Sequence, residues 1–368
     1  MVTAKLLGIE NINTYASYPR TDLLSNIGMK FIWTSRYLKR NENLFKELEN
    51  SIHERMTKLS PQEYGDVYEL PCIYPEEIQE DTLSKVLQSP FPVVIKGVLK
   101  DSYAVKNWSL DFFKNNYGNA NILCLKQSNN EEKYGTTEYQ PHYQVHTSSW
   151  HTVDELVNSI RAGERRYAIG SAAIFGSHNK IIEEANLKGI EELFHCQVMR
   201  PELIIAGLNT SSFFHCAIAG NIFCLLHGEK RWNFVAPWHS PWMYANVGHS
   251  RSHGYLASPI ISKEQEKDPS RYPLYKYVPK YTVRLSAGDI LFNPPWWWHE
   301  VVNFSESIGM PLRVTFGLGG IQPTNILFNL FAAFGSYKVI PTTIINFLRK
   351  KIDVDDSKVV NAIHSKLD

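Results

Sequence analysis

The chain has 368 residues, with 38 basic against 37 acidic side chains and a formal net charge of +1 at pH 7. This balance argues against binding to nucleic acid or to an anionic membrane surface through bulk charge. The five cysteines include no C-x-x-C pair, which argues against a disulfide framework. The sequence has no long apolar run, so we predict a cytoplasmic protein with no membrane span.

Residues 1–90 are predicted to form a helical N-terminal extension. Residues 23–37 read as one helix, and the stretch 44–56 carries apolar residues at four-residue spacing between charges, which indicates a second, amphipathic helix. Residues 66–74 are strand-like, and 75–88 are predicted to be helical. No chemistry is visible here, so the extension is interpreted as a packing or substrate-capping segment.

Residues 91–322 are predicted to form the main domain, which is rich in strands. Helices are expected at 108–118, 152–163 and 179–195, and Thr152 with Glu155 three residues later has the spacing of a capping box. The strand-like runs on which the fold prediction depends are 91–98, 203–208, 221–226, 284–293 and 312–316.

Two stretches of this domain lack periodicity and are interpreted as long connections. Residues 129–152 are polar and hold three histidines. The loose spacing of these histidines favours solvated loop residues over metal ligands. They are His142, His146 and His151. Residues 239–273 have mixed polarity, and long loops of this kind are often functional or mobile.

Residues 323–368 are predicted to be a C-terminal helical segment. Its apolar part, 325–351, is divided by Gly335 and Pro341. Helices this apolar must be covered, either by the main domain or by a second subunit, and we expect a homodimer.

The residues that suggest chemistry lie in two stretches of the main domain. The first reads NTSSFFHCAIAGN from Asn209 and continues into the turn Gly228-Glu229-Lys230-Arg231-Trp232. The second, AGDILFNPPWWWHE, ends at Glu300 and contains His299 after three tryptophans. Two histidines on separate predicted strands suggest one shared metal ion.

These motifs resemble those of the jumonji C and cupin-like oxygenases, over roughly residues 90–320. That family includes the asparaginyl hydroxylase known as factor inhibiting HIF. The resemblance implies a mainly β fold, the double-stranded β-helix of cupins and jelly rolls, here with helical N- and C-terminal extensions. It also implies the use of Fe(II) and 2-oxoglutarate.

The resemblance assigns roles to individual residues. His215 and His299 match the two iron-binding histidines, and Lys230 matches the lysine that pairs with the distal carboxylate of 2-oxoglutarate. Asn221 and Ser212 match polar positions that help to hold this co-substrate. A lysine inside a barrel is costly unless it meets an opposite charge, which the co-substrate would supply.

The chain departs from the family at one position. The family motif is His-x-Asp or His-x-Glu, whereas this chain reads His215-Cys216-Ala217. Because side chains alternate along a strand, Cys216 should point away from the metal, and Glu300 should do the same beside His299. The third facial position is therefore predicted to lack a protein ligand.

Three functions remain open at this stage. The chain could hydroxylate a protein side chain, or it could hydroxylate or halogenate an apolar or aromatic small molecule, with chloride in the third position as in iron halogenases with a His-x-Ala motif. The aromatic residues 296–298 favour an apolar substrate or a dimer. It could also be an inactive binding or scaffold protein that no longer uses iron.

Overall fold

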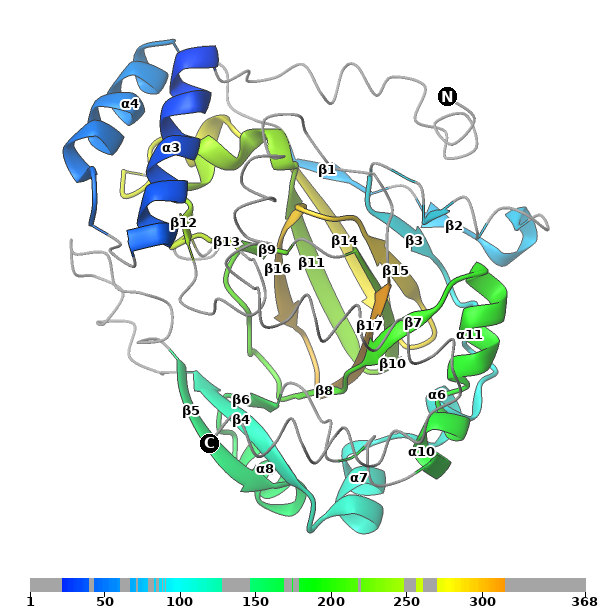
Figure 1. Cartoon of the computed structure of the whole chain (residues 1–368). Helices are drawn as coiled ribbons and strands as arrows, with labels where there is room; N and C mark the ends of the chain where they lie inside the picture. The colour runs from blue at the N-terminus through cyan, green and yellow to red at the C-terminus, as the bar shows by residue number, and fades with distance from the viewer. Residues whose placement is uncertain are drawn as a thin grey trace, which may run out of the picture.

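The computed structural model describes two β-sheets that face each other, with helices at one corner and along one sheet (Figure 1). The helices at the corner are α3 and α4. The helices along the sheet come later in the chain and are α6, α7, α8, α10 and α11. The described residues are 22–39, 43–59, 67–70, 72–78, 83, 86–87, 89, 91–127, 146–168, 174, 179–217, 220–247, 256–260 and 270–314.

The seven-stranded sheet has the order β1-β14-β11-β16-β9-β13-β12. Only its β1–β14 pair is parallel among the pairs that the structure describes there. Its strands are β1 (Val67–Glu69), β9 (His215–Cys216), β11 (Glu229–Val235), β12 (Asn246–Val247), β13 (Leu256–Ala257), β14 (Lys280–Ser286) and β16 (Trp298–Asn303).

The ten-stranded sheet has the order β2-β3-β15-β10-β17-β8-β6-β4-β5, with β7 also paired to β17. Its strands are β2 (Cys72–Ile73), β3 (Val93–Ile95), β4 (Asn121–Gln127), β5 (His146–Thr152), β6 (Arg166–Ala168), β7 (Val198–Pro201), β8 (Ile204–Ala206), β10 (Gly220–His227), β15 (Ile290–Asn293) and β17 (Ser307–Val314).

The chain changes sheets repeatedly between β9 and β17. It passes from β9 to β10, back to β11, and then from β14 to β15, β16 and β17, alternating between the two sheets. This is the winding of a jelly roll, so the predicted mainly β, double-stranded β-helix fold is confirmed. Gly228, at φ 79°, makes the turn from β10 to β11 possible, because a Cβ there would lie 2.0 Å from the carbonyl oxygen of Glu306.

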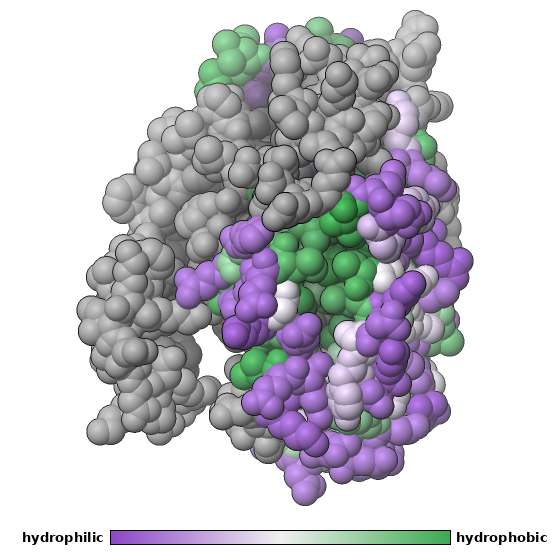
Figure 2. Space-filling view, turned by 90° about the vertical axis from the view of Figure 1, so that its right-hand side faces the viewer, coloured by the Kyte–Doolittle hydropathy of each residue, from purple (hydrophilic) through white to green (hydrophobic). Residues whose placement is uncertain are grey.

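Strand β10 is buried on both faces, which explains its continuous apolar sequence. Phe223 and Leu225 point into the space between the sheets, where they meet Trp232 and Phe234 of β11. Ile222 and Cys224 point outward into a second cluster, which is covered by the helices. On the face that carries β2, β3 and α11, apolar side chains gather in a hollow bordered by hydrophilic ones (Figure 2).

The helices have local signals at their ends. Thr152 and Glu155 form the predicted capping box of α8 (Val153–Arg161), while Ser102 and Ser109 cap α6 (Tyr103–Asn107) and α7 (Leu110–Tyr117). The helix predicted at 179–195 is confirmed as α10 (Asn179–Glu184) and α11 (Leu187–Phe194). The stretch 75–88 begins with a 3-10 helix, η1 (Pro75–Glu77). Another 3-10 helix, η5, spans Tyr275–Tyr277.

The two predicted N-terminal helices are α3 (Leu23–Lys39) and α4 (Lys46–Leu59). They pack with the 3-10 helix η4 (Pro237–Met243) in a cluster that also receives Cys216, Trp296 and Trp298. Arg36 and Glu49 form a buried, bidentate ion pair between the two helices, with both N–O distances 3.0 Å. The extension therefore packs against the outer side of the seven-stranded sheet.

Three sequence interpretations were wrong. The predicted loop 129–152 ends in strand β5, which pairs with all seven residues of β4, since a polar sequence suits the solvent-facing side of an edge strand. The predicted strand 284–293 is two strands in different sheets, separated at Gly288 with φ 97°. The connection 239–273 contributes β12 and β13, and β13 pairs with β9 beside His215.

The C-terminal segment 323–368 lies outside the described residues, and so does the predicted dimer-forming part, 325–351. The homodimer therefore stays a prediction. Within the described part of the chain, no helix has the length and apolar character needed to cross a bilayer. The predicted domain boundaries at 90 and 322 likewise stay predictions.

Candidate metal centre

Two histidines meet on neighbouring strands of the seven-stranded sheet. His215 of β9 lies directly opposite His299 of β16 in antiparallel register, so the two side chains share one face. Their ring centroids are 4.2 Å apart, with 54° between the ring planes. His299 also stacks on Trp232, which belongs to the cluster between the sheets. The pair therefore faces the interior.

Hydrogen bonds orient both imidazoles in the same way. Nδ1 of His215 lies 2.9 Å from the carbonyl oxygen of Phe213, and Nδ1 of His299 lies 3.0 Å from that of Trp297. Because a carbonyl oxygen can only accept, each Nδ1 carries the hydrogen and each Nε2 keeps its lone pair. Metal-binding histidines are commonly held by such a bond from the second ring nitrogen.

Both imidazoles are held in the neutral form. Burial lowers the pKa of His215 to about 4, the bond to Phe213 opposes this, and the charge of Arg313 adds to it. Burial and the neighbouring His215 hold the pKa of His299 well below its ordinary value. No proton therefore has to be displaced from either ring when a metal binds near neutral pH.

Lys230 of β11 is buried, with an exposed fraction of 2 %. Its ammonium group donates a hydrogen bond to Oδ1 of Asn303, and no carboxylate of the described residues forms an ion pair with it. Burial lowers the pKa of Lys230 to about 7. Asn303 is itself held by Ser307 and Thr210, at 3.0 and 2.8 Å, so the lysine has a fixed but uncharged partner.

Lys230 and the histidine pair lie on the same inner face but at different heights. In the β11–β16 register, Phe234 lies opposite His299 and Lys230 lies opposite Asn303. Four residues of strand correspond to about 13 Å. Trp232 occupies the face between these levels, and Phe223 lies 5.9 Å from the Lys230 ammonium. The site thus has a cation at one end, two nitrogen donors at the other and aromatic rings between.

The residues beside the two histidines offer no third metal ligand. Cys216 is fully buried in the cluster with α3 and α4, on the other side of the strand, and Glu300 accepts a hydrogen bond from Asn233 at 2.8 Å. The carbonyl oxygen of Ala217 accepts a hydrogen bond from Trp296. Across the described residues, no group of three His, Cys, Asp or Glu side chains could hold a metal ion.

The two predicted co-substrate residues occupy different environments. Ser212 is bonded to β16, since its hydroxyl accepts a hydrogen bond from the backbone nitrogen of Val301 at 2.9 Å. Asn221 is 5 % exposed on the inner side of β10, and its Oδ1 has no hydrogen-bond partner among the described residues. Asn221 is therefore the more available of the two for a ligand.

Sequence reasoning missed three polar residues of this interior: Asn293, Asn303 and Arg313. Asn293 and Arg313 lie on either side of Asn221, on β15 and β17, and Asn303 lies on β16. The available signal was a polar residue within or at the end of an apolar strand, as in ILFN for Asn293. The pattern does not say which strands are neighbours, and so it could not bring these residues together.

The three tryptophans before His299 are core residues. Trp296 and Trp298 pack against the N-terminal helices, and Trp297 lies between the sheets, with exposed fractions of 3 %, 0 % and 0 %. They are buried within the chain, so they form no exposed surface, and the apolar substrate or dimer that residues 296–298 favour stays a prediction.

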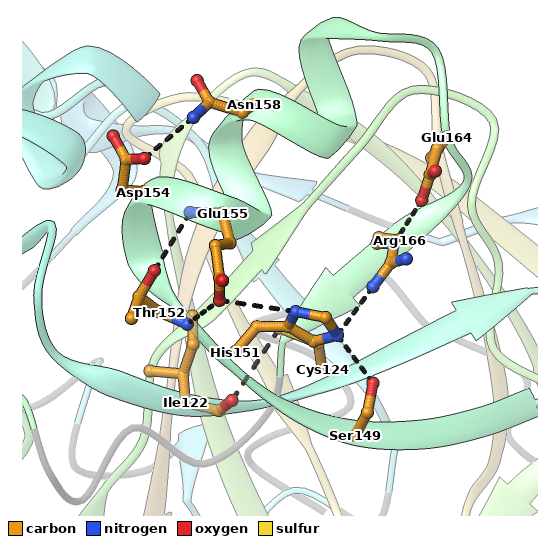
Figure 3. A network of polar contacts seen from close by, with 10 residues as sticks. All are labelled: Ile122, Cys124, Ser149, His151, Thr152, Asp154, Glu155, Asn158, Glu164 and Arg166. Atoms are coloured by element: carbon orange, nitrogen blue, oxygen red, sulfur yellow. Dashed lines mark hydrogen bonds and ion pairs between the residues drawn. The ribbon is translucent and has the colours of Figure 1, made fainter.

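A second polar network surrounds His151 (Figure 3). Nε2 of His151 lies 2.7 Å from Oγ of Ser149 and 2.9 Å from Nη1 of Arg166, and Nδ1 lies 3.5 Å from Glu155. A catalytic triad would need Nε2 as a free base, but the guanidinium must donate to it. The network joins β5, β6 and α8, and four strands separate β5 from β10.

Comparison with known proteins gives one family and several partial relatives. The model of the "Cupin-like domain" family matches residues 79–331. The fly Jumonji C domain-containing protein 5 (Drosophila melanogaster) is 33 % identical over 27 % of this chain and 24 % of its own length. Human HSPB1-associated protein 1 is 31 % identical over 22 % and 16 %.

Chicken tRNA wybutosine-synthesizing protein 5 (Gallus gallus) is 27 % identical over 34 % of each chain. These matched segments cover about a third or less of the relatives' own lengths. The similarity therefore extends to part of each relative and does not assign the activity of any of these proteins to this chain.

Proposed function

The chain belongs to the cupin-like domain family, and we propose that it acts there as an Fe(II)- and 2-oxoglutarate-dependent oxygenase-type enzyme. The observation that carries this proposal is the buried ammonium of Lys230, which has no carboxylate partner among the described residues and shares an inner face with two convergent histidines. A buried charge is expensive unless it is paired, so an anionic ligand is the natural partner of Lys230.

The donor set fits such a centre in part. Nε2 of His215 and Nε2 of His299 would hold the iron, since imidazole suits Fe(II). When bound together with 2-oxoglutarate, the iron would supply the activation of O₂. Lys230, oriented by Asn303, would bind the distal carboxylate, while Phe223, Trp232 and Phe234 would exclude water from the space between the two ends.

Ala217 distinguishes this proposal from ordinary hydroxylation. A methyl group donates no electron pair, so water or an anion would complete the metal coordination. Replacing a carboxylate by alanine removes one negative charge beside the metal, which favours an anion such as chloride on electrostatic grounds. Hydroxylation with water in this position and halogenation with chloride are therefore both outcomes that the proposal allows.

An iron-free binding or scaffold protein is the second candidate. It is favoured by one observation, namely that the described residues provide two metal donors and no third. The names of two relatives refer to an association with HSPB1 and to a tRNA. The near-neutral charge of this chain favours a protein side chain or an apolar or aromatic small molecule over nucleic acid.

The decisive experiment loads the metal-free full chain with Fe(II) without oxygen and measures metal content and 2-oxoglutarate binding. We expect iron to bind, 2-oxoglutarate to bind through Lys230, and succinate to form when oxygen is admitted. His299→Ala should remove metal binding, whereas His151→Ala, in the remote network, should leave it unchanged. If the wild-type chain binds neither iron nor 2-oxoglutarate, the binding-protein candidate replaces the oxygenase.

A further inference from the structure

Helix α3 is apolar on two opposite faces. Its inner face, with Met29 and Trp33 at most 2 % exposed, packs onto the main domain. At about 100° of rotation per residue, the opposite face carries four large apolar side chains. They are 53–68 % exposed and comprise Leu23, Leu24, Ile27 and Phe31. A surface helix normally turns polar side chains outward, so the outer face of α3 needs a partner.

Helix α4 follows the ordinary pattern except where it begins beside α3. Ile52 is buried and Glu54 is exposed, as expected for an amphipathic helix at an outer corner of the molecule (Figure 1). Phe45 and Leu48, however, are 40 % and 42 % exposed, and the ring of Phe45 lies 5.2 Å from that of Phe31. Together with the four outer residues of α3, these two side chains form a continuous surface, the α3–α4 patch.

The α3–α4 patch concentrates the exposed apolar surface of the molecule. Among the described residues, thirteen large apolar side chains are exposed, and six of them belong to this patch. The others are distributed over further parts of the chain, such as Trp150 on β5 and Leu208 after β8. Single exposed apolar residues are ordinary, whereas a contiguous group of this kind marks an interaction site.

The α3–α4 patch is too small to form a stable protein interface by itself. A large side chain that is half exposed offers about 100 Å² of surface, so six of them offer about 600 Å². A standard interface takes about 800 Å² from each partner. An interface built on this patch therefore requires a further apolar segment beside it.

The C-terminal segment starts beside the two helices that carry the patch. The last described strand, β17, ends at Val314, which pairs with Gly220 of β10. A Cβ at Gly220 would lie 3.6 Å from Cδ of Pro295, and the next residue, Trp296, belongs to the cluster that α3 and α4 cover. Residues 315–368 therefore continue from a point next to that cluster.

The sequence of this continuation supplies the apolar surface that the patch lacks. The stretch 325–351 is predicted to be helical, and its first half carries apolar residues at the spacing of one helix face. They are Leu327, Leu330, Phe331 and Phe334. Such a face is suited to a groove or patch of apolar side chains on another pair of helices.

We infer that the α3–α4 patch is part of a homodimer interface and receives residues 325–351 of a second copy of this chain. In a two-fold arrangement each copy contributes one patch and one segment, so both apolar surfaces are buried twice. This brings the interface to the size that a stable dimer needs. The inference gives the N-terminal helices a role in assembly, and it does not depend on the proposed function, because no residue of the metal centre takes part.

The test measures the mass of the full chain by light scattering over a range of micromolar concentrations. The wild type should have twice the 42.3 kDa of one chain. Ile27→Asp and Phe331→Asp should each raise the dimer dissociation constant more than about 100-fold, because a carboxylate would be buried in an apolar interface. Both should keep the wild-type circular dichroism spectrum. Trp150→Asp is the matched control, since Trp150 is 69 % exposed on β5, and it should leave the mass unchanged.

A photoreactive amino acid in place of Ile27 identifies what covers the patch, in a mixture of isotope-labelled and unlabelled full chains. We expect a cross-link between two copies that joins position 27 to residues 325–351. A cross-link within one chain, or one that maps to another segment, would overturn the inference. So would a monomeric wild type, including one that sediments with phospholipid vesicles through Ile27, or a dimer that Trp150→Asp dissociates and Ile27→Asp does not.

Discussion

The chain buries positive charge in two regions and treats it in opposite ways. Between α3 and α4, Arg36 is paired with Glu49 through two bonds of 3.0 Å, and Lys46 adds a third bond to the same carboxylate at 2.8 Å. Between the sheets, Lys230 is equally buried but bonds to the neutral amide of Asn303. The first charge is satisfied by the folded chain itself.

The second charge is left for a partner from outside. An ion pair that is complete within the fold needs no ligand, whereas an uncompensated ammonium raises the free energy of the folded state until an anion binds. This difference in charge compensation distinguishes a structural ion pair from a binding site, and it does not depend on similarity to other proteins. The following substitutions test this contrast, in order of decreasing change in free energy.

Glu49→Leu should destabilise the protein by about 3–5 kcal/mol, because it leaves Arg36 as an unpaired buried charge. The free energy of unfolding from urea denaturation checks this value. Glu229→Leu is the control, since its pair with Arg284 is exposed and should contribute less than about 1 kcal/mol. Similar losses for the two variants would contradict the structural role of the Arg36–Glu49 pair.

Lys230→Met should stabilise the ligand-free protein by about 1–4 kcal/mol while abolishing 2-oxoglutarate binding, because it removes a buried charge that lacks a carboxylate partner. The same substitution at Lys96 should destabilise, since Lys96 pairs with the buried carboxylate of Asp289 at 2.5 Å. Opposite signs for these two lysines are expected in thermal melts. A loss of stability in Lys230→Met would show that its charge is already compensated.

Ala217→Asp should increase the affinity for Mn(II) or Fe(II) at least tenfold, about 1.4 kcal/mol, by supplying a carboxylate oxygen as a third donor beside the two histidines. Chelator competition measures the change. Glu300→Gln should leave the affinity unaltered, because Glu300 is bonded to Asn233 on the other side of the strand. Equal affinities for Ala217→Asp and wild type would mean that position 217 does not face the metal.

Dicarboxylate affinity should fall about tenfold for each pH unit above 7. The pKa of Lys230 is lowered to about 7, so above that pH the free site must take up a proton before it binds a carboxylate. The stability of the ligand-free protein changes with pH in the opposite direction, because it rises as the pH rises. The unfolded chain keeps this proton up to its ordinary pKa near 10.4, so the cost of Lys230 is full below pH 7 and declines as pH rises.

Calorimetry in two buffers with different ionisation enthalpies would measure the proton uptake on binding. We expect about one proton per dicarboxylate at pH 8 and almost none at pH 6. Lys230→Met should take up none at either pH. An affinity that is independent of pH across this range would contradict a lowered pKa for Lys230.

Elements that depend on neighbours along the chain could be predicted from local sequence patterns. The capping box at Thr152 and the apolar run of β10 were predicted from local spacing and are present in the structure. The motif residues His215, Lys230 and His299 were found through their resemblance to a family, and the fold brings all three to one inner face. Local patterns indicate which residues must be buried or capped, and the predictions that rested on them agree with the structure.

Tertiary structure alone decided which strands are neighbours. Asn293, Asn221 and Arg313 are separated by up to 92 positions and meet only because β15, β10 and β17 pair in one register. The same holds for β5, whose polar sequence became a strand through pairing with β4, and for β13 beside β9. Strand pairing is set by contacts distant in sequence, and a shift of one residue would turn Arg313 to the opposite face, so no local pattern could have assigned it.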